Sequence, residues 1–336
     1  MLRRKKVGII VGPGGCTGAI TAGMFAELVA SLRRMGVTPT YIQGISVGGL
    51  VACGFTELRD MIVAWLRLGK KGITALFNYF EIPFRLFGTS WFSNRGLVQL
   101  AARVDPRKLF EVSEKTEIEI AVRDEGSRRS PEARRTRFIS SRNKRLYAQA
   151  HLWREFLEAG CCIPGILPSK NIVGRVYSDA LYPSFGRVFR KGCDVVFFCS
   201  SDQPQSEKPL SRFMQWLVGR WFMRIREPFN NTYEGLIEHK LRVLLSSKKH
   251  PGIKLFALDA PVELLDRIQD ILTPLTPENF ARAERAIVIV TPNKAIDRLN
   301  LIYFTEQSIR EGIHHGRDRM RETLKALGCT ARPPET

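Results

Sequence analysis

The sequence predicts an α/β fold in which a mainly parallel sheet is covered by helices. The first 55 residues alternate between apolar runs and segments of helical periodicity, in the order strand, helix, strand, helix. Residues 7–11 form a continuous apolar run that ends in glycines, which is typical of a strand buried on both faces. Hydrophobic residues make up 44% of the 336-residue chain, enough for a large core, so a disordered polycation is excluded.

The elements follow in order from apolar runs, which predict buried strands, and from a period of 3.6 residues, which predicts helices. We expect strands at 7–11, 39–44, 116–122, 136–140, 194–199, 254–258 and 286–290. We expect helices at 19–35, 47–55, 147–160, 210–226, 233–245 and 305–327. Residues 60–92 mix aromatic and basic side chains, and the tail 329–336 is rich in proline and predicted to be disordered.

The net charge restricts the kind of partner, and the cysteine content restricts the redox state of the compartment. The chain has 52 Lys and Arg against 33 Asp and Glu, a formal net charge of +19, which predicts an anionic partner. Zinc-finger spacing, an aromatic RNP motif and a clear helix-turn-helix are missing from the sequence, so a nucleic-acid partner is the less favoured explanation. Seven sparse Cys suggest neither a disulfide framework nor a paired zinc site, which favours a reducing compartment.

The start of the chain resembles a secretory signal only superficially. Basic residues precede the apolar run at 7–11, but glycines and a proline at 12–15 interrupt it after five residues. No stretch reaches about 18 uncharged apolar residues, the length that a bilayer span requires. We therefore expect a mature N-terminus, no signal peptide or transmembrane helix, and a cytoplasmic protein.

Gly44-Ile45-Ser46-Val47-Gly48 matches the pattern G-x-S-x-G, which places a nucleophilic serine on a tight turn from strand to helix. The flanking glycines matter because the backbone of the serine is strained and neighbouring Cβ atoms would collide. The match falls between the predicted strand 39–44 and the predicted helix 47–55, where this mechanism requires it. A plain turn between strand and helix would fit the same string.

The loop after the first strand, 12–18, is rich in glycine and has three functional interpretations. A dinucleotide fingerprint fails because its third glycine comes one place late and no acid ends the second strand. A Walker loop lacks its Lys-Ser/Thr. An oxyanion hole fits, because the backbone N–H groups of Gly14 and Gly15 would lie at a helix N-terminus beside Ser46. A glycine turn that only packs helix on strand is the remaining alternative.

The general base is predicted to be a carboxylate. An ordinary α/β-hydrolase places its nucleophile after several strands and a His downstream, whereas here one strand and one helix precede the serine strand. None of the five His lies in a glycine-rich or turn-rich setting. They are His151, His239, His250, His314 and His315. Although His314 and His315 lie near Asp318, their basic helix favours solvated side chains over metal ligands, and we expect no metal or other cofactor.

Four blocks of the sequence resemble the patatin-like phospholipase family, in the family's order. They are PGGCTG (13–18), GISVGG (44–49), CCIPGILPS (161–169) and YSDALYP (177–183), the last followed by the strand DVVFFC (194–199). The segment 291–299 and the helix around 313–316 look like the C-terminal part of bacterial members. The resemblance implies a three-layer α/β/α fold, with a catalytic core at 1–200 and a C-terminal extension at 201–328 packed on the same core.

The resemblance also implies an activity, the hydrolysis of acyl esters of lipids by a Ser-Asp dyad. The matching positions are Ser46 as nucleophile, Asp179 as general base, Gly14, Gly15 and Cys16 as backbone donors of the oxyanion hole, and Gly44 and Gly48 as the glycines flanking the nucleophile. Two departures stand out: Pro13 and Thr17 replace a glycine and a basic residue of the family's G-G-G-x-R-G loop, and Ala180 replaces the glycine after the aspartate. A catalytically weak or dead scaffold that binds lipid or protein is therefore the alternative.

The predicted helix 210–226 carries part of the positive charge. Its apolar residues recur at i, i+3 and i+4 and are flanked by arginines, as in a helix that lies in a membrane interface. A core-facing helix with a solvated edge fits equally well. On the first interpretation the membrane contacts are Trp216, Arg220, Trp221 and Arg224. The expected partners are then a phospholipid or another acyl-ester lipid and an anionic membrane surface.

Overall fold

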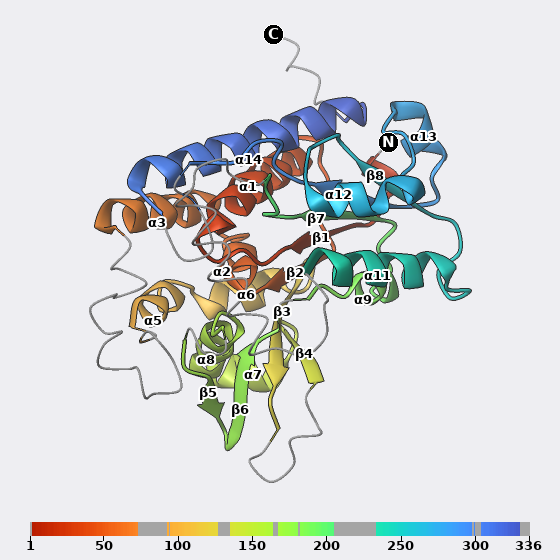
Figure 1. The fold of residues 1–336 in the computed structure, drawn as a ribbon. Helices are drawn as coiled ribbons and strands as arrows, with labels where there is room; N and C mark the ends of the chain where they lie inside the picture. Colours follow the sequence, from red (N-terminus) through yellow and green to blue (C-terminus); the bar gives the residue numbers. More distant parts are fainter. Residues whose placement is uncertain are drawn as a thin grey trace.

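The structure is a computed structural model, and it describes residues 2–72, 93, 95–126, 135–163, 167–180, 182–204, 233–297, 299 and 304–329. In these residues a nine-stranded sheet has helices on both faces (Figure 1). The strands are β1 (Val7–Val11), β2 (Tyr41–Ile45), β3 (Glu117–Asp124), β4 (Arg135–Ser140), β5 (Lys170–Ile172), β6 (Arg175–Asp179), β7 (Val195–Cys199), β8 (Ile253–Ala257) and β9 (Arg285–Val290). Six of them, in the order β3-β2-β1-β7-β9-β8, are parallel, so the predicted fold class is confirmed.

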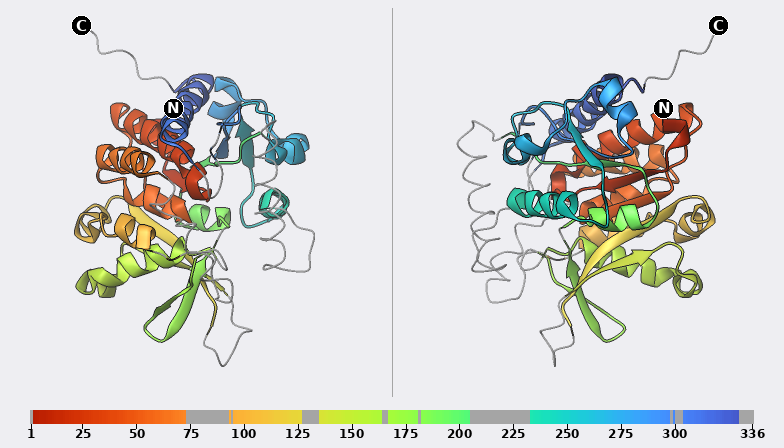
Figure 2. Two further views of the ribbon diagram at one scale, coloured as in Figure 1. Left: turned by 60° about the vertical axis from the view of Figure 1, so that its left-hand side comes forward. Right: turned by 90° about the vertical axis from the view of Figure 1, so that its right-hand side faces the viewer.

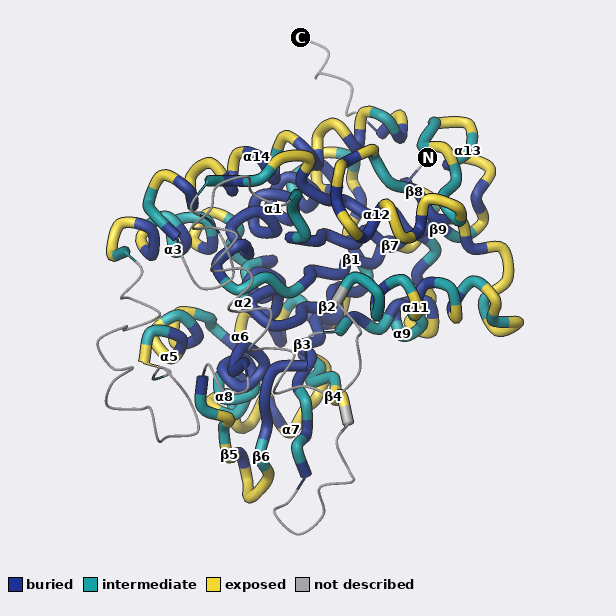
Figure 3. Tube along the Cα trace, in the orientation of Figure 1, coloured by how far each residue is buried: buried dark blue, intermediate teal, exposed yellow. Residues whose placement is uncertain are grey.

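The parallel strands are buried because their residues are apolar on both faces, as in β1 and β7, where every residue is buried (Figure 3). Each of the seven predicted strands is present within two residues of its expected bounds. The hairpin β5–β6 was not predicted. Strands β8 and β9, which follow residue 200, belong to the same sheet as β1.

The helices form two layers, one on each face of the sheet (Figure 2). One layer contains α1 (Gly18–Arg34), α2 (Val47–Cys53), α3 (Leu58–Lys71), α5 (Arg95–Ala101), α6 (Pro106–Val112), α7 (Lys144–Ala148), α8 (Ala150–Gly160), α13 (Pro277–Arg282) and α14 (Glu306–Ala326). The other contains α9 (Phe185–Arg190), α11 (Tyr233–Ser246) and α12 (Glu263–Ile268). The predicted helix 147–160 is present as α7 and α8, whereas the predicted helix 210–226 lies outside the described residues.

Helices α1 and α14 cross at very short range. A Cβ on Gly23 would lie 2.1 Å from the carbonyl oxygen of Ile313, and one on Gly316 would lie 2.1 Å from that of Ile20. The stretch Gly15–Arg34 is long and apolar enough to cross a membrane, but 89% of its apolar 18-residue window is buried inside the fold. Its position between the sheet and α14 is that of a core helix.

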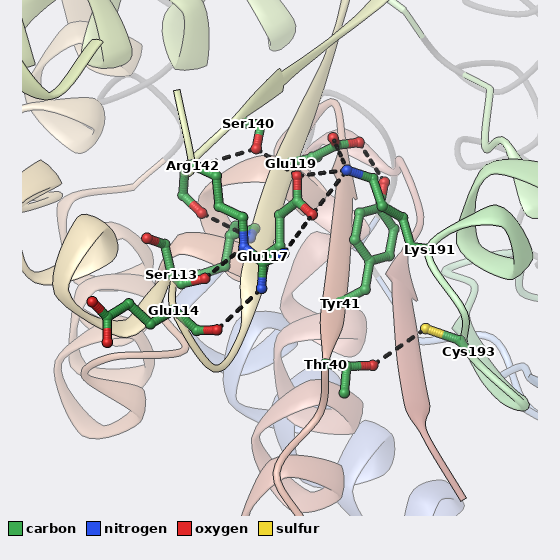
Figure 4. A network of polar contacts seen from close by, with 12 residues as sticks. Thr40, Tyr41, Ser113, Glu114, Glu117, Glu119, Ser140, Arg142, Lys191 and Cys193 are labelled. Atoms are coloured by element: carbon green, nitrogen blue, oxygen red, sulfur yellow. Dashed lines mark hydrogen bonds and ion pairs between the residues drawn. The ribbon is translucent and has the colours of Figure 1, made fainter. Parts of the chain in front are cut away.

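A polar network joins β2 and β3 to the neighbouring helix α9 and the turn after it (Figure 4). The Tyr41 hydroxyl and the Arg187 guanidinium donate to the buried carboxylate of Glu119, and Lys191 Nζ donates to Glu117 Oε1 at 2.7 Å. Burial alone would raise the pKa of Glu119, but the hydrogen bonds from Arg187 and Tyr41 hold that pKa below its usual range. The network therefore keeps a charged Glu119 inside the sheet.

Candidate active site

Ser46 occupies the turn between β2 and α2 in a backbone conformation that few residues adopt. Its φ is 56° and its ψ is −134°, and the only other described non-glycine residue with a positive φ is Val173. Such conformations cost about 1–3 kcal/mol and are concentrated at functional sites. Ser46 is 4% exposed and lies at the N-terminus of α2, whose backbone dipole favours negative charge there.

The two glycines that flank Ser46 are required by close approaches of the backbone. A Cβ on Gly44 would lie 2.5 Å from the Cα of Gly49, and a Cβ on Gly48 would lie 2.3 Å from the carbonyl oxygen of Val11. Both distances are far below van der Waals contact. Only glycine at these positions lets the turn close on itself and rest against the end of β1, as the G-x-S-x-G pattern predicts.

Asp179 is the last residue of β6, and strand pairing brings it next to this turn. Strand β4 occupies one edge of β3 along 119–124. On the opposite edge, β2 pairs up to Ala121, opposite Ile45, and β6 pairs from Val122, opposite Asp179. Strands β2 and β6 therefore meet end to end on one edge of β3. Consecutive residues of a strand are about 3.3 Å apart along its axis. Asp179 therefore lies next to the point where the chain leaves β2 at Ser46.

The side chain of Asp179 lies on the same face of the sheet as Ser46. Residues directly opposite each other in paired strands point to the same face. Val122, the partner of Asp179, faces α8, because a Cβ on Gly160 would lie 3.6 Å from its Cγ1. Helix α2, which begins after Ser46, covers this face too. Asp179 is fully buried, and its backbone N–H donates to the carbonyl oxygen of Cys162 at 3.0 Å. The next residue, Ala180, does not have a positive φ, so alanine is tolerated where the family usually has glycine.

Two buried thiols, those of Cys161 and Cys162, lie near Asp179 and remain protonated. Burial, together with the negative charge of Asp179, raises the pKa of Cys162 to about 12. The same two causes raise the pKa of Cys161, which also interacts with Cys53. A thiol must ionise to act as a nucleophile. Ser46 is therefore the better candidate nucleophile in this part of the site.

The glycine loop lies beside the Ser46 turn, as the parallel pairing of β1 and β2 predicts. A Cβ on Gly48 would lie 2.6 Å from the carbonyl oxygen of Gly12, so the two segments touch. Gly15 has a φ of 53°, which favours glycine, and begins the short 3-10 helix Gly15–Thr17 that leads into α1. Cys16, the third predicted donor residue, has a fully buried side chain.

Comparison with known protein families identifies the family of this chain. A sequence model described as patatin-like phospholipase matches residues 9–182, more than half of the chain. The chain belongs to the patatin-like phospholipase family. The matched segment of this patatin-like protein begins in β1 and ends shortly after Asp179, so it includes the glycine loop, Ser46 and the strands between them. The mainly parallel sheet with helices on both faces is the patatin-like three-layer α/β/α fold.

Among solved structures, VipD from Legionella pneumophila matches with a TM-score of 0.41 and 11% sequence identity. The match covers 96% of the present chain and 67% of VipD. No curated protein matches the chain.

Two features of the site region are not predicted from the sequence. The hairpin β5–β6 has a turn at Val173 and Gly174 between short alternating segments, a signal that could have predicted it. Ser201, which follows β7, contacts the glycine loop, and no local pattern indicates this. The predicted membrane-contact residues lie outside the described residues, and they are Trp216, Arg220, Trp221 and Arg224.

Proposed function

We propose that this patatin-like protein is a serine acyl hydrolase that cleaves ester-linked fatty acyl groups of membrane lipids. The observation that carries the proposal is the meeting of β2 and β6 on one edge of β3. This pairing brings a strained, glycine-flanked Ser46 next to a buried Asp179 on the same face of the sheet. Family membership supports a lipid acyl hydrolase in general.

In the proposed mechanism Asp179 accepts the proton of Ser46 Oγ, which attacks the ester carbonyl and forms a tetrahedral intermediate. The backbone N–H groups of Gly14 and Gly15, with Cys16 beside them, donate to the developing oxyanion. Collapse of the intermediate expels the alcohol portion of the lipid and leaves an acyl group on Ser46. Water, activated by the same carboxylate, then releases the fatty acid.

The test combines a covalent probe with ester hydrolysis. A fluorophosphonate probe should label the parent protein, and p-nitrophenyl esters should be hydrolysed. Ser46→Ala should abolish both, and Asp179→Asn should reduce hydrolysis by at least about 1,000-fold because the base is lost. Ser178→Ala is a matched control, because it removes a neighbouring hydroxyl that donates to Glu125 instead. Hydrolysis by Ser46→Ala at the parent's rate would refute the proposal, and a folded parent without any activity would favour a lipid-binding scaffold.

We further propose that the substrate lies in an anionic membrane surface and that the protein binds this surface peripherally from the cytoplasm. Helix α3 supports this. The Trp65 ring lies 3.1 Å from the position that a Cβ on Gly18 would occupy. Val47, the residue after the candidate nucleophile, lies beside the same position. Helix α3 ends in the exposed Lys70 and Lys71. Basic residues near an anionic surface contribute about 1 kcal/mol each.

Co-sedimentation with vesicles tests the membrane proposal. Binding should require anionic lipid and should weaken as salt rises from about 0.05 to 0.5 M, because the Debye length falls. Lys70→Glu combined with Lys71→Glu should weaken vesicle binding without lowering hydrolysis of a soluble ester. Binding to neutral vesicles that does not depend on salt, or preferential binding to DNA, would contradict the proposal.

A further inference from the structure

Two hydroxyl groups hold the backbone of the glycine loop. Ser201 Oγ donates to the carbonyl oxygen of Pro13 at 2.6 Å, and Thr17 Oγ1 donates to the carbonyl oxygen of Gly14 at 2.6 Å. The Thr17 N–H donates to the same Gly14 oxygen at 3.0 Å. Ser201 reaches the loop because β7, which precedes it, is the neighbour of β1 in the sheet. Two consecutive carbonyl groups of the loop are therefore fixed, one by a residue of the loop itself and one by a residue that follows β7.

These carbonyl groups share peptide planes with the two proposed oxyanion donors. In a trans peptide the C=O of one residue and the N–H of the next point in opposite directions, and no described peptide bond is cis. Fixing the Pro13 carbonyl therefore fixes the direction of the Gly14 N–H. Fixing the Gly14 carbonyl does the same for the Gly15 N–H. Within the described ranges, neither N–H has a hydrogen-bond acceptor.

The closeness of the two hydroxyls explains why residue 14 is glycine. A Cβ on Gly14 would lie 2.2 Å from Ser201 Oγ and 2.5 Å from Thr17 Oγ1. Glycine at this position and the two hydroxyls beside it form one packed unit.

We propose that Thr17 and Ser201 are positioning residues that orient the Gly14 and Gly15 N–H groups as an oxyanion hole. The inference rests on the proposed function of Ser46 as a nucleophile. Thr17 occupies the place where the family's loop usually has a basic residue, and its hydroxyl stabilises the loop by a hydrogen bond to the backbone. In this proposal neither hydroxyl contacts the oxyanion, because each binds a carbonyl oxygen that points away from the donor N–H of the same peptide group.

Matched substitutions test the inference. Thr17→Val keeps the shape of the side chain and removes the hydroxyl, whereas Thr17→Ser keeps the hydroxyl. Ser201→Ala removes the second hydroxyl, and Ser200→Ala is its control, because Ser200 is also buried but its Oγ accepts from Asp202 N. The readouts are kcat and KM for a soluble p-nitrophenyl ester, the rate of fluorophosphonate labelling, and the midpoint of thermal unfolding.

We expect Thr17→Val and Ser201→Ala each to lower kcat and the labelling rate about tenfold with KM unchanged. Complete loss of one oxyanion donor costs about 100- to 1,000-fold, and a loosened donor loses part of that effect. Thr17→Ser and Ser200→Ala should remain within about twofold of the parent. If Ser201→Ala fails to fold, the Thr17→Val and Thr17→Ser pair still decides the question.

Two kinds of failure are distinguishable. If Ser46→Ala is inactive but a folded Thr17→Val has the kcat of Thr17→Ser, or if its loss appears only in KM, the positioning role is wrong and the proposed function stands. If Ser46→Ala is as active as the parent, or if the parent shows neither hydrolysis nor labelling, the proposed function fails and this inference fails with it.

Discussion

Alanine at Gly48 tests the close approach that shapes the Ser46 turn. The added Cβ would lie 2.3 Å from the carbonyl oxygen of Val11 and 2.6 Å from that of Gly12. Contacts to a Cβ are essentially never shorter than 3.0 Å, so the start of α2 has to move away from β1 by about 0.7 Å. Both obstructing atoms belong to the backbone, so no side chain can rotate to make room.

The expected cost has two parts. Overpacking costs about 1–3 kcal/mol, and the better helix propensity of alanine returns up to about 1 kcal/mol, so Gly48→Ala should lower the free energy of unfolding by about 1–2 kcal/mol. A misplacement of about 1 Å in a catalytic group costs about 100-fold in rate, so a shift of about 0.7 Å should reduce hydrolysis by 10- to 100-fold.

Gly49→Ala is the matched control in the same helix. Its Cβ would meet Leu157 Cδ1 at 3.3 Å, and Leu157 is a side chain that can adjust. This variant should gain the same helix propensity and stay within about 1 kcal/mol of the parent. Urea unfolding gives the stabilities, and p-nitrophenyl ester hydrolysis gives the activities. If Gly48→Ala matches Gly49→Ala in both measurements, the steric explanation of the turn is wrong.

Three further predictions concern the rest of the fold. Glu119→Gln should lose about 2–3 kcal/mol at pH 7, because it leaves the partly buried Arg187 without its carboxylate. The folded pKa of Glu119 is lowered, so its contribution is present above the unfolded value of about 4.3 and is lost as pH falls through the folded pKa. Urea titrations should therefore show a smaller loss of stability in acid for Glu119→Gln than for the parent. Gly316→Ala should cost about 1–3 kcal/mol by forcing α14 away from α1, whereas the exposed His314→Ala on the same helix should change stability by less than about 0.5 kcal/mol in the same assay. All seven cysteines are buried and free, so Ellman's reagent should react with none in the native protein and with seven in urea, and rapid native labelling would contradict this burial.

The sequence predicted the Ser46 turn well because every part of its signal is local. The apolar run of β2, the glycines at 44 and 48 and the helical period after Ser46 lie within about fifteen residues. Parallel pairing of β1 and β2 then predicted that the glycine loop would lie beside Ser46, and this is confirmed by the close approach of Gly48 to Gly12. Asp179 was assigned only through the resemblance to a family, because β6 is short and was not recognised as a strand.

By itself, the sequence determined the fold class, the positions of the buried strands and the need for glycine around Ser46. These features depend on hydrophobic periodicity and on backbone sterics, which act between near neighbours in the chain. Only the tertiary structure decided that β4 pairs with one edge of β3 while β2 and β6 pair with the other. Only the tertiary structure, likewise, brought the Ser201 hydroxyl into hydrogen bonding with the carbonyl of Pro13, 188 residues away. Such pairings depend on which strands compete for the same edge of the sheet, and no local pattern records the outcome of that competition.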